Sequence, residues 1–336
     1  FTIAVEKPFG TDLASARSLN RKLEKLLPEN RIQRVDHFLG KSTVLNLLGF
    51  RFANRIFEPM WNADNIAKVE IAYDEELGLE SRAGYYDKAG ALVDMIQSHL
   101  LQVLALVTME PPSSVDADDL RGGMAQALRA TRVWNGDPAG SSKRARYTAG
   151  VINGRKLIDY AKEQGVDAKR KTETLAEITL EVENWRWAGV PFVLRSGKAL
   201  ADSAKGITIT FKDVPHLPTG LKGHQTPAAL RIGLSPETLE FDLNINGAGS
   251  PFELDAIVMS AEFAQGELDA YGEVIAGILN SDPTLSVRGD VAEECWRIVG
   301  PILAAWRKDE VPLETYRAGS NGPATWAKRQ PAPRVR

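Results

Sequence analysis

The chain has 336 residues, of which 43% are apolar and 25% charged, and its formal net charge is −3 at pH 7. These proportions are those of an ordinary soluble globular protein, and the small net charge offers no general field to attract nucleic acid or an anionic membrane. Cys295 is the single cysteine, so the sequence predicts neither an intrachain disulfide nor a Cys/His metal cluster. A chain of this length is expected to form two structural units, or one large sheet domain with an appendage.

The first thirty residues predict a strand, a turn and a helix. The chain opens on Phe1 with a short apolar run that Pro8 and Gly10 end, and leucines at helical spacing follow Thr11 or Asp12 as the N-cap. This order resembles the last unit of a doubly wound nucleotide-binding domain. Because a lone terminal strand cannot stand without neighbours, we expect the natural protein to continue upstream of Phe1, a processed or engineered start being the alternative.

Later segments predict an α+β domain on a large, mostly antiparallel sheet with helices, preceded by the last βα unit of a Rossmann-like domain. Helices are expected at 42–57, 90–112, near 119–133, near 168–179, at 267–282 and at 290–308. Strands are expected at 65–75, 185–198, 206–214, 229–235 and 238–246. No apolar stretch is expected to reach the about 18 residues of a membrane span. We place the remnant of the dinucleotide-binding domain at 1–35 and a substrate-binding and oligomerisation domain at 36–336.

The chain has four histidines, and their settings differ. His216 and His224 lie in a Pro/Gly-rich stretch that predicts surface loops. His99 lies inside the apolar helix, where at about 100° per residue it shares an arc of about 140° with Asp94, Ser98 and Gln102. This polar flank is either a structural seam or the setting of a general base. A base needs a carboxylate partner; Asp36 is a candidate that the sequence alone does not place.

The stretch RVDHFLGK, residues 34–41, carries a second candidate. If a helix begins here, His37 and Lys41 project from one face near its N-terminus as two cationic donors, which suits an anion. This spacing also occurs often by chance. Neither GxGxxG nor GxxxxGK[ST] is present, so no nucleotide-binding fingerprint is visible.

Several motifs occur in an order and spacing that resemble the glucose-6-phosphate dehydrogenase family. They are EKPFG, RVDHFLGK, RFANRIF, AGYYDKAGALVDMIQSHLLQ, RWAGVPFVLRSGK, DPTLSVRGDVAEECWRIVGPIL and YRAGSNGP. The resemblance extends from the first residues to about residue 325 and begins at the last strand of the family's coenzyme domain. It implies oxidation of glucose 6-phosphate at C1 to 6-phosphogluconolactone, with hydride transfer to NADP⁺, or NAD⁺, in the cytoplasmic pentose phosphate pathway. It also implies a homodimer or homotetramer built on the large sheet, with neither nucleic acid nor membrane as partner.

The resemblance assigns roles residue by residue. It implies His99 as the base and Asp36 as its carboxylate partner, His37 and Lys41 as phosphate ligands, Glu75, Asp94 and Lys198 as sugar ligands, and Lys7 between sugar and nicotinamide.

Three positions depart from the family pattern and put phosphate affinity in question. Phe38 stands where the family usually has Tyr, Ser42 where an acidic residue is usual, and Ser203 where a basic one is usual. Whether Lys205 replaces that basic residue is open at this point. The chain alone is expected to catalyse poorly, because most coenzyme contacts would lie upstream. The alternatives are a non-catalytic sugar-phosphate-binding paralogue without a coenzyme domain, and a dehydrogenase of another sugar phosphate.

Overall fold

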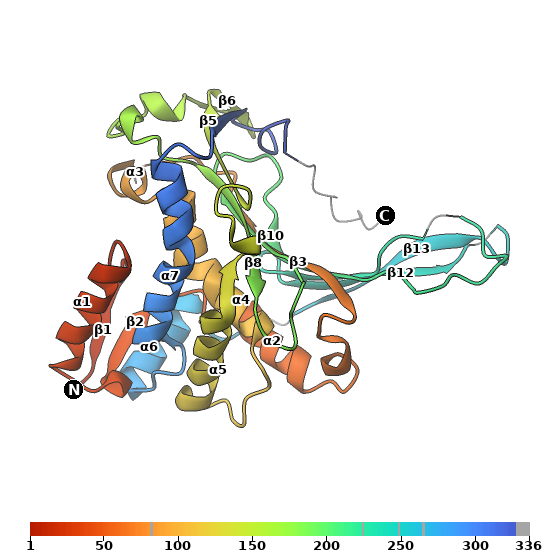
Figure 1. Cartoon of the computed structure of the whole chain (residues 1–336), viewed down its shortest axis with the longest axis horizontal. Helices are drawn as coiled ribbons and strands as arrows, with labels where there is room; N and C mark the ends of the chain where they lie inside the picture. The colour runs from red at the N-terminus through yellow and green to blue at the C-terminus, as the bar shows by residue number, and fades with distance from the viewer. Residues whose placement is uncertain (81–82, 224, 248, 264–265, 327–336) are drawn as a thin grey trace.

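The computed structural model describes residues 1–80, 83–223, 225–247, 249–263 and 266–326. Helices and two main sheets form the body of the molecule, and the hairpin of β12 (Thr238–Asn246) and β13 (Leu254–Glu262) extends from it as a long arm (Figure 1). His216 is exposed, as expected, whereas His224 lies outside the described residues.

The N-terminal segment folds as the expected βα unit. β1 (Ile3–Val5) and β2 (Ile32–Val35) are parallel, with Val5 opposite Arg34, and α1 (Leu13–Glu24) connects them. Asp12 caps α1 by accepting the N–H of Ser15 at 2.7 Å. β14 (Ser286–Val287) adds a third, antiparallel strand beside β2. Through β14, and through the packing of α1 against α7 (Gly289–Arg307), the N-terminal unit is joined to the rest of the chain.

The large sheet has ten strands in the order β13-β12-β11-β10-β3-β9-β8-β5-β15, with β4 paired to β8. Its remaining bounds are β3 Ile66–Asp74, β4 Thr131–Val133, β5 Ser142–Thr148, β8 Leu175–Val182, β9 Phe192–Gly197, β10 Lys205–Phe211, β11 Ala229–Gly233 and β15 Leu313–Arg317. A separate hairpin joins β6 Gly150–Ile152 to β7 Arg155–Leu157. Only β3–β9 and β5–β15 pair in parallel among these described strands, which confirms a mostly antiparallel sheet.

Helices cover the sheet and enclose the main apolar core. They are α2 Ser42–Phe52, α3 Ala83–Ala91, the π-helix η3 Leu92–Leu100, α4 Leu101–Thr108, α5 Ala117–Ala130, α6 Ala270–Asn280 and α7 Gly289–Arg307. Short 3₁₀ turns are η1 Glu29–Arg31, η2 Glu58–Met60, η4 Trp134–Gly136, η5 Tyr160–Lys162 and η6 Ala168–Arg170. Side chains such as Leu104, Leu194 and Ile298, all fully or almost fully buried, join the helices to the sheet.

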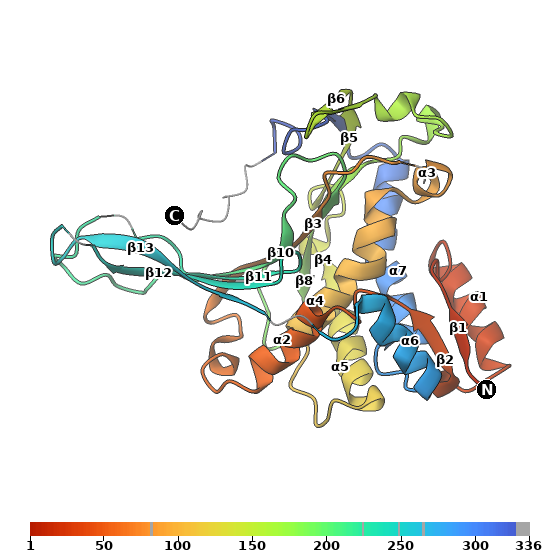
Figure 2. The same ribbon diagram turned by 180° about the vertical axis from the view of Figure 1, so that it is seen from behind.

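The helix Ala83–Thr108 corrects one expectation. Its length and composition suffice to cross a membrane, although the sequence was expected to contain no such stretch. However, 89% of its most apolar window is buried inside the protein. It runs through the body of the molecule, and its π-helical part packs against α7 (Figure 2). Its apolar character is therefore explained by its place in the core.

The helix expected near 168–179 is wrong. The chain there makes the short turn η6 and then enters β8. From Ile178 to Val182 buried and partly exposed residues alternate, which is the period of a strand. The Lys- and Glu-rich approach favours a helix locally, but pairing of β8 with β5 and β9 overrides that propensity.

Candidate active site

Two side chains of the site follow the parallel strands β1 and β2. Lys7 and Asp36 each lie two residues beyond the matched pair Val5 and Arg34, so they leave the small sheet at the same level. The carboxyl edge of parallel strands is where ligands bind in doubly wound folds. The register of this unit therefore places an ammonium and a carboxylate side by side.

The large sheet repeats this arrangement at its parallel pair. Glu75 and Lys198 each follow the matched residues Asp74 and Gly197 at the ends of β3 and β9. The Lys198 ammonium donates to Glu75 Oε2 at 2.7 Å and lies 5.3 Å from the ring centre of buried Tyr86. Each of the two parallel strand pairs thus contributes one carboxylate and one ammonium to the site.

The π-helix η3 contributes two further expected residues. η3 packs against both β3 and β9 and carries Asp94 and His99. In an α-helix, two residues five apart lie about 140° apart around the axis. The wider π-turn bonds residue i to residue i+5 and brings such a pair together. Accordingly, one ammonium, that of Lys7, lies 3.1 Å from Asp94 Oδ1 and 2.9 Å from His99 Nε2.

The expected polar arc at 100° per residue is therefore wrong in its details. Gln102 turns away and donates to Cys295 Sγ at 3.4 Å, and the Ser98 hydroxyl donates to the Val93 carbonyl, five residues earlier, at 2.9 Å. Of the arc, Asp94 and His99 alone contact Lys7 among the described residues.

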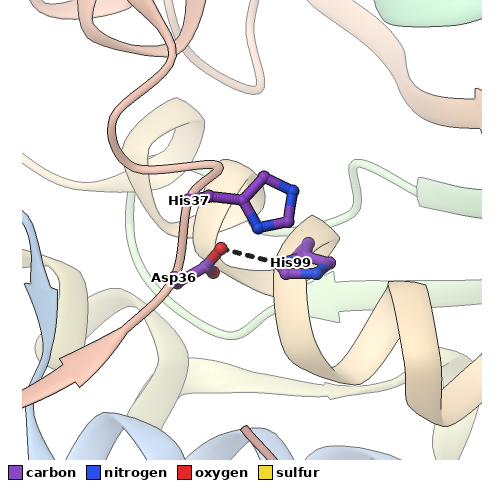
Figure 3. A group of neighbouring side chains, drawn as sticks. All are labelled: Asp36, His37 and His99. Carbon is purple, nitrogen blue, oxygen red and sulfur yellow. Dashed lines mark hydrogen bonds and ion pairs between the residues drawn. The ribbon is translucent and has the colours of Figure 1, made fainter. Parts of the chain in front are cut away.

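His99 and Asp36 form a buried acid–base pair. His99 Nδ1 lies 2.6 Å from Asp36 Oδ1, and each side chain is 2% exposed. The two side chains point toward one another from the helix and from the end of β2 (Figure 3). Because the Lys7 ammonium can only donate, His99 Nε2 is an acceptor and Nδ1 carries the proton. The imidazole is thus held in the tautomer that leaves a lone pair on Nε2, as a base requires.

The turn at residues 36–40 positions the neighbours of this pair. The Phe38 N–H donates to Asp36 Oδ1 at 2.9 Å, and the Phe38 ring stacks on His99 at 4.4 Å between ring centres. Gly40 is required because a Cβ there would lie 2.3 Å from the carbonyl oxygen of Ala270, where α6 begins. Phe38 thus contacts both members of the Asp36–His99 pair, Asp36 through its main-chain N–H and His99 through its ring.

His37 lies above the acid–base pair (Figure 3). It does not share a helix face with Lys41 as expected, because α2 begins only at Ser42 and Lys41 is its N-cap. Its ring stacks on Tyr271, with 5.0 Å between ring centres and 8° between planes. Burial lowers the pKa of His37 to about 4, and the neighbouring His99, Lys7 and Lys41 lower it further, against Asp36. His37 is therefore a neutral donor at pH 7, and the expectation of two cationic donors is corrected.

Lys41 and Lys205 approach each other around two aromatic rings. The Lys41 ammonium lies 5.4 Å from the ring centre of Phe38, and that of Lys205 lies 5.3 Å from the ring centre of Tyr73. The two rings are 5.0 Å apart. Burial lowers the pKa of Lys41, and Lys205 lowers it further, while Glu237 opposes both. Two half-buried ammonium groups that repel each other form a site suited to an anion.

Asp36, His37 and His99 also satisfy the simple criteria for a metal site. Their possible ligand atoms all lie within 4.8 Å of one another. However, the Lys7 ammonium is 2.9 Å from His99 Nε2, and its positive charge repels a metal cation at this distance. The Asp36 oxygen nearest the histidine already accepts two N–H groups. We therefore interpret the cluster as a proton-transfer site.

Two residues around the site were not expected from the sequence. Tyr271 stacks on His37, and Glu237 accepts the Ser42 hydroxyl at 2.9 Å with both oxygens. Both come from segments about two hundred residues away, and no local pattern marks them. Glu237 supplies a carboxylate beside Lys41 at the point where Ser42 lacks one.

An imidazole held between a carboxylate and an ammonium, at the carboxyl edge of a Rossmann-like βαβ unit, is an arrangement suited to acid–base chemistry on a bound ligand. The comparisons with known proteins are specific. Residues 48–330 match the model of the glucose-6-phosphate dehydrogenase C-terminal domain, and residues 2–46 match that of the glucose-6-phosphate dehydrogenase NAD binding domain. The chain belongs to the glucose-6-phosphate dehydrogenase family.

Relatives and solved structures agree with this assignment. Glucose-6-phosphate 1-dehydrogenase of Rhizobium meliloti is 41% identical over 96% of this chain and 67% of its own length. That of Treponema pallidum is 40% identical over 96% of this chain and 64% of its own length. A solved glucose-6-phosphate dehydrogenase in complex with its substrate glucose-6-phosphate is similar at TM-score 0.87 and 32% identity, covering 96% of this chain and 67% of that one. The chain thus spans about two thirds of the length of these proteins.

Proposed function

We propose that this chain carries the sugar-phosphate site of a glucose-6-phosphate dehydrogenase that oxidises glucose 6-phosphate at C1 to 6-phosphogluconolactone. The observation that carries the proposal is His99, held with Nδ1 on Asp36 and Nε2 on Lys7. A sugar-binding paralogue without catalysis has no need of a base in a fixed tautomer, so this alternative is not favoured.

The proposed chemistry moves one proton and one hydride. The C1 hydroxyl takes the place of Lys7 at His99 Nε2, and its proton passes to this nitrogen. The C–O bond gains double-bond character as C1 loses its hydride, and the bound nicotinamide supplies the hydride acceptor. Asp36 stabilises the imidazolium that results, since its carboxylate lies 2.6 Å from Nδ1.

The remaining expected residues surround this base in a way that suits a sugar phosphate. Glu75, Asp94 and Lys198 offer hydrogen bonds to hydroxyl groups, and His37 and Lys41 offer donors to the 6-phosphate. In the free protein Lys7 and Lys198 each contact a carboxylate, so sugar hydroxyls would replace one ion pair at each place. The roles of these residues are part of the proposal.

The coenzyme is proposed to be NADP⁺, with NAD⁺ as the alternative. Lys7 fits the nicotinamide side of the site, because its ammonium lies at the carboxyl edge of β1 and reaches His99 Nε2. The choice between the two coenzymes depends on contacts to the adenosine ribose, far from this ammonium along the coenzyme. We further propose a cytoplasmic enzyme of the pentose phosphate pathway, a homodimer or homotetramer through the large sheet, and the domain division 1–35 and 36–336.

The test uses the full-length protein as its source cell makes it, after its intact mass has been measured. Turnover of glucose 6-phosphate is measured with NADP⁺ and with NAD⁺, and kcat/KM is compared with that for unphosphorylated glucose. We expect lactone formation and a strong preference for the phosphorylated sugar. Absence of turnover with either coenzyme, at sugar concentrations that saturate binding, would contradict the proposal.

Lys205 offers a prediction about the phosphate. Lys205→Ala is expected to raise KM for glucose 6-phosphate about tenfold to a hundredfold with kcat nearly unchanged, because a hydrogen bond to a charged group is worth about 1.5–3 kcal/mol. Lys41→Ala should act in the same way, since a phosphate contact exists in ground and transition states alike. Steady-state kinetics with glucose 6-phosphate and with glucose measure both.

Lys212, exposed just beyond the far end of β10, provides the matched control. Lys212→Ala should leave both constants unchanged. An equal loss of kcat/KM for glucose and for glucose 6-phosphate in Lys205→Ala would assign Lys205 a role other than phosphate binding.

A further inference from the structure

Glu173 is a buried carboxylate that the proposed reaction does not use. It lies just before β8, is 6% exposed, and holds the start of the π-helix that carries Asp94 and His99. The Leu92 N–H donates to its Oε1 at 3.0 Å, and the Ala91 N–H donates to its main-chain carbonyl at 3.3 Å. One residue thus binds the first two N–H groups at the start of η3.

The chain bends at Gly90 to make this contact. Gly90 has φ of 70° and interrupts the helix between α3 and η3. A Cβ at this position would lie 2.3 Å from Glu173 Oε1, so only glycine admits the carboxylate. The direction in which η3 leaves the bend is therefore set where Glu173 touches the backbone.

The charge of Glu173 costs stability. Burial raises the pKa of Glu173 to about 7, against the Leu92 N–H and the positive charge of Arg144. Burial raises the pKa of Tyr86 and of Tyr160, and the charge of Glu173 raises each further. The folded protein therefore binds more protons than the unfolded chain between about pH 4.5 and about pH 7, and stability falls as pH rises through this window. A glutamine would accept the same N–H without this cost.

A group that costs stability where a neutral isostere would serve is typical of a functional site. We propose that Glu173 is a positioning residue: its ionised carboxylate, bound to the start of η3, sets the orientation in which Asp94 and His99 face the substrate. A negative charge also suits the N-terminal end of a helix, where N–H groups lack partners. The inference rests on the proposed function.

Glu173→Gln in the complete protein tests the proposal, since glutamine imitates the protonated acid. At about pH 8.5 the variant is expected to have kcat about tenfold below the unsubstituted protein with KM nearly unchanged, because small displacements of a base are costly. At about pH 5.5 the two proteins should agree, since Glu173 is then itself protonated. Because both proteins contain the same general base, its titration cancels when kcat of the variant is divided by kcat of the unsubstituted protein at each pH.

Thermal unfolding supplies a second readout. At about pH 8.5 Glu173→Gln should unfold at a higher temperature than the unsubstituted protein, and the difference should vanish toward about pH 4.5. Glu183→Gln, exposed just beyond the other end of β8, is the control and should change neither kcat nor stability.

Lower activity combined with higher stability at the same pH distinguishes positioning from structural capping. A kcat ratio that does not depend on pH, or a variant as active as its parent at pH 8.5, would overturn the inference. So would a loss of stability that accompanies the loss of activity at every pH. If the unsubstituted protein turned over no glucose 6-phosphate, the proposed function would fail, whereas the stability comparison would still be informative about Glu173.

Discussion

Replacing His99 with asparagine is expected to lower kcat by about 10²–10⁴-fold, the range that general bases contribute. Asparagine can still donate to Asp36, but its amide does not accept a proton at the position of Nε2. His99 contacts Asp36 at 2.6 Å and Lys7 at 2.9 Å through its two ring nitrogens. The neighbouring His37, whose ring centre lies 4.9 Å from that of His99, has a pKa that burial lowers to about 4 and is a weaker base. Turnover of glucose 6-phosphate and the affinity for the sugar phosphate are the measurements.

The His99 result is meaningful only if the fold and the sugar site persist. Circular dichroism and the unfolding temperature should match the parent, and glucose 6-phosphate should still bind. His216→Asn, in an exposed loop, is the matched control and should keep full activity. Turnover of His99→Asn within a few-fold of its parent would remove His99 from the reaction.

Asp36→Asn is the second large effect, with an expected loss of about 10²–10⁴-fold in kcat. Asp36 Oδ1 accepts both the Phe38 N–H and the His99 Nδ1–H. An asparagine that keeps these two contacts through its oxygen loses the charge that stabilises the imidazolium. One that turns its NH₂ toward His99 forces the wrong tautomer and places a proton on Nε2. Either outcome impairs the base, and KM for glucose 6-phosphate should change little.

A double-mutant cycle makes the Asp36 prediction sharper. Because the two residues act as one unit, Asp36→Asn combined with His99→Asn should be no slower than His99→Asn alone. If the loss of kcat in the double variant equalled the product of the two single losses, Asp36 would act independently of His99, for example through the fold. The unfolding temperature of each variant checks that possibility separately.

Features that local sequence controls could be predicted. Asp12 caps α1 where the N-cap was expected, and the alternating runs at 206–214, 229–235 and 238–246 became β10, β11 and β12. The partnership of Asp36 and His99 was available only as a candidate from the residues, and as an implication of the family. The structure confirms that the two are in contact.

Other features depend on the tertiary structure. The sequence LVDMIQSHL does not distinguish a π-helix from an α-helix, since both bury the same apolar residues. Only the wider π-turn brings Asp94 and His99, five residues apart, onto the same Lys7 ammonium. Pairing with two neighbours drew β8 out of a sequence with helical propensity. Tyr271 and Glu237 come from segments distant in sequence that the fold brings to the site, so no local sequence pattern could identify them.

The site is built from residues of two separately matched family segments, and this affects how the two segments can evolve. Lys7 and Asp36 belong to the segment matched by the NAD binding domain, residues 2–46, whereas Asp94 and His99 belong to the segment matched by the C-terminal domain, residues 48–330. The hydrogen bonds from Lys7 to Asp94 and His99, and between His99 and Asp36, all cross that boundary. A recombination event at the junction would separate an imidazole from the carboxylate and the ammonium that orient it. The two segments are therefore expected to be inherited together, and substitutions at Lys7 or Asp36 are expected to depend on the residues present at 94 and 99.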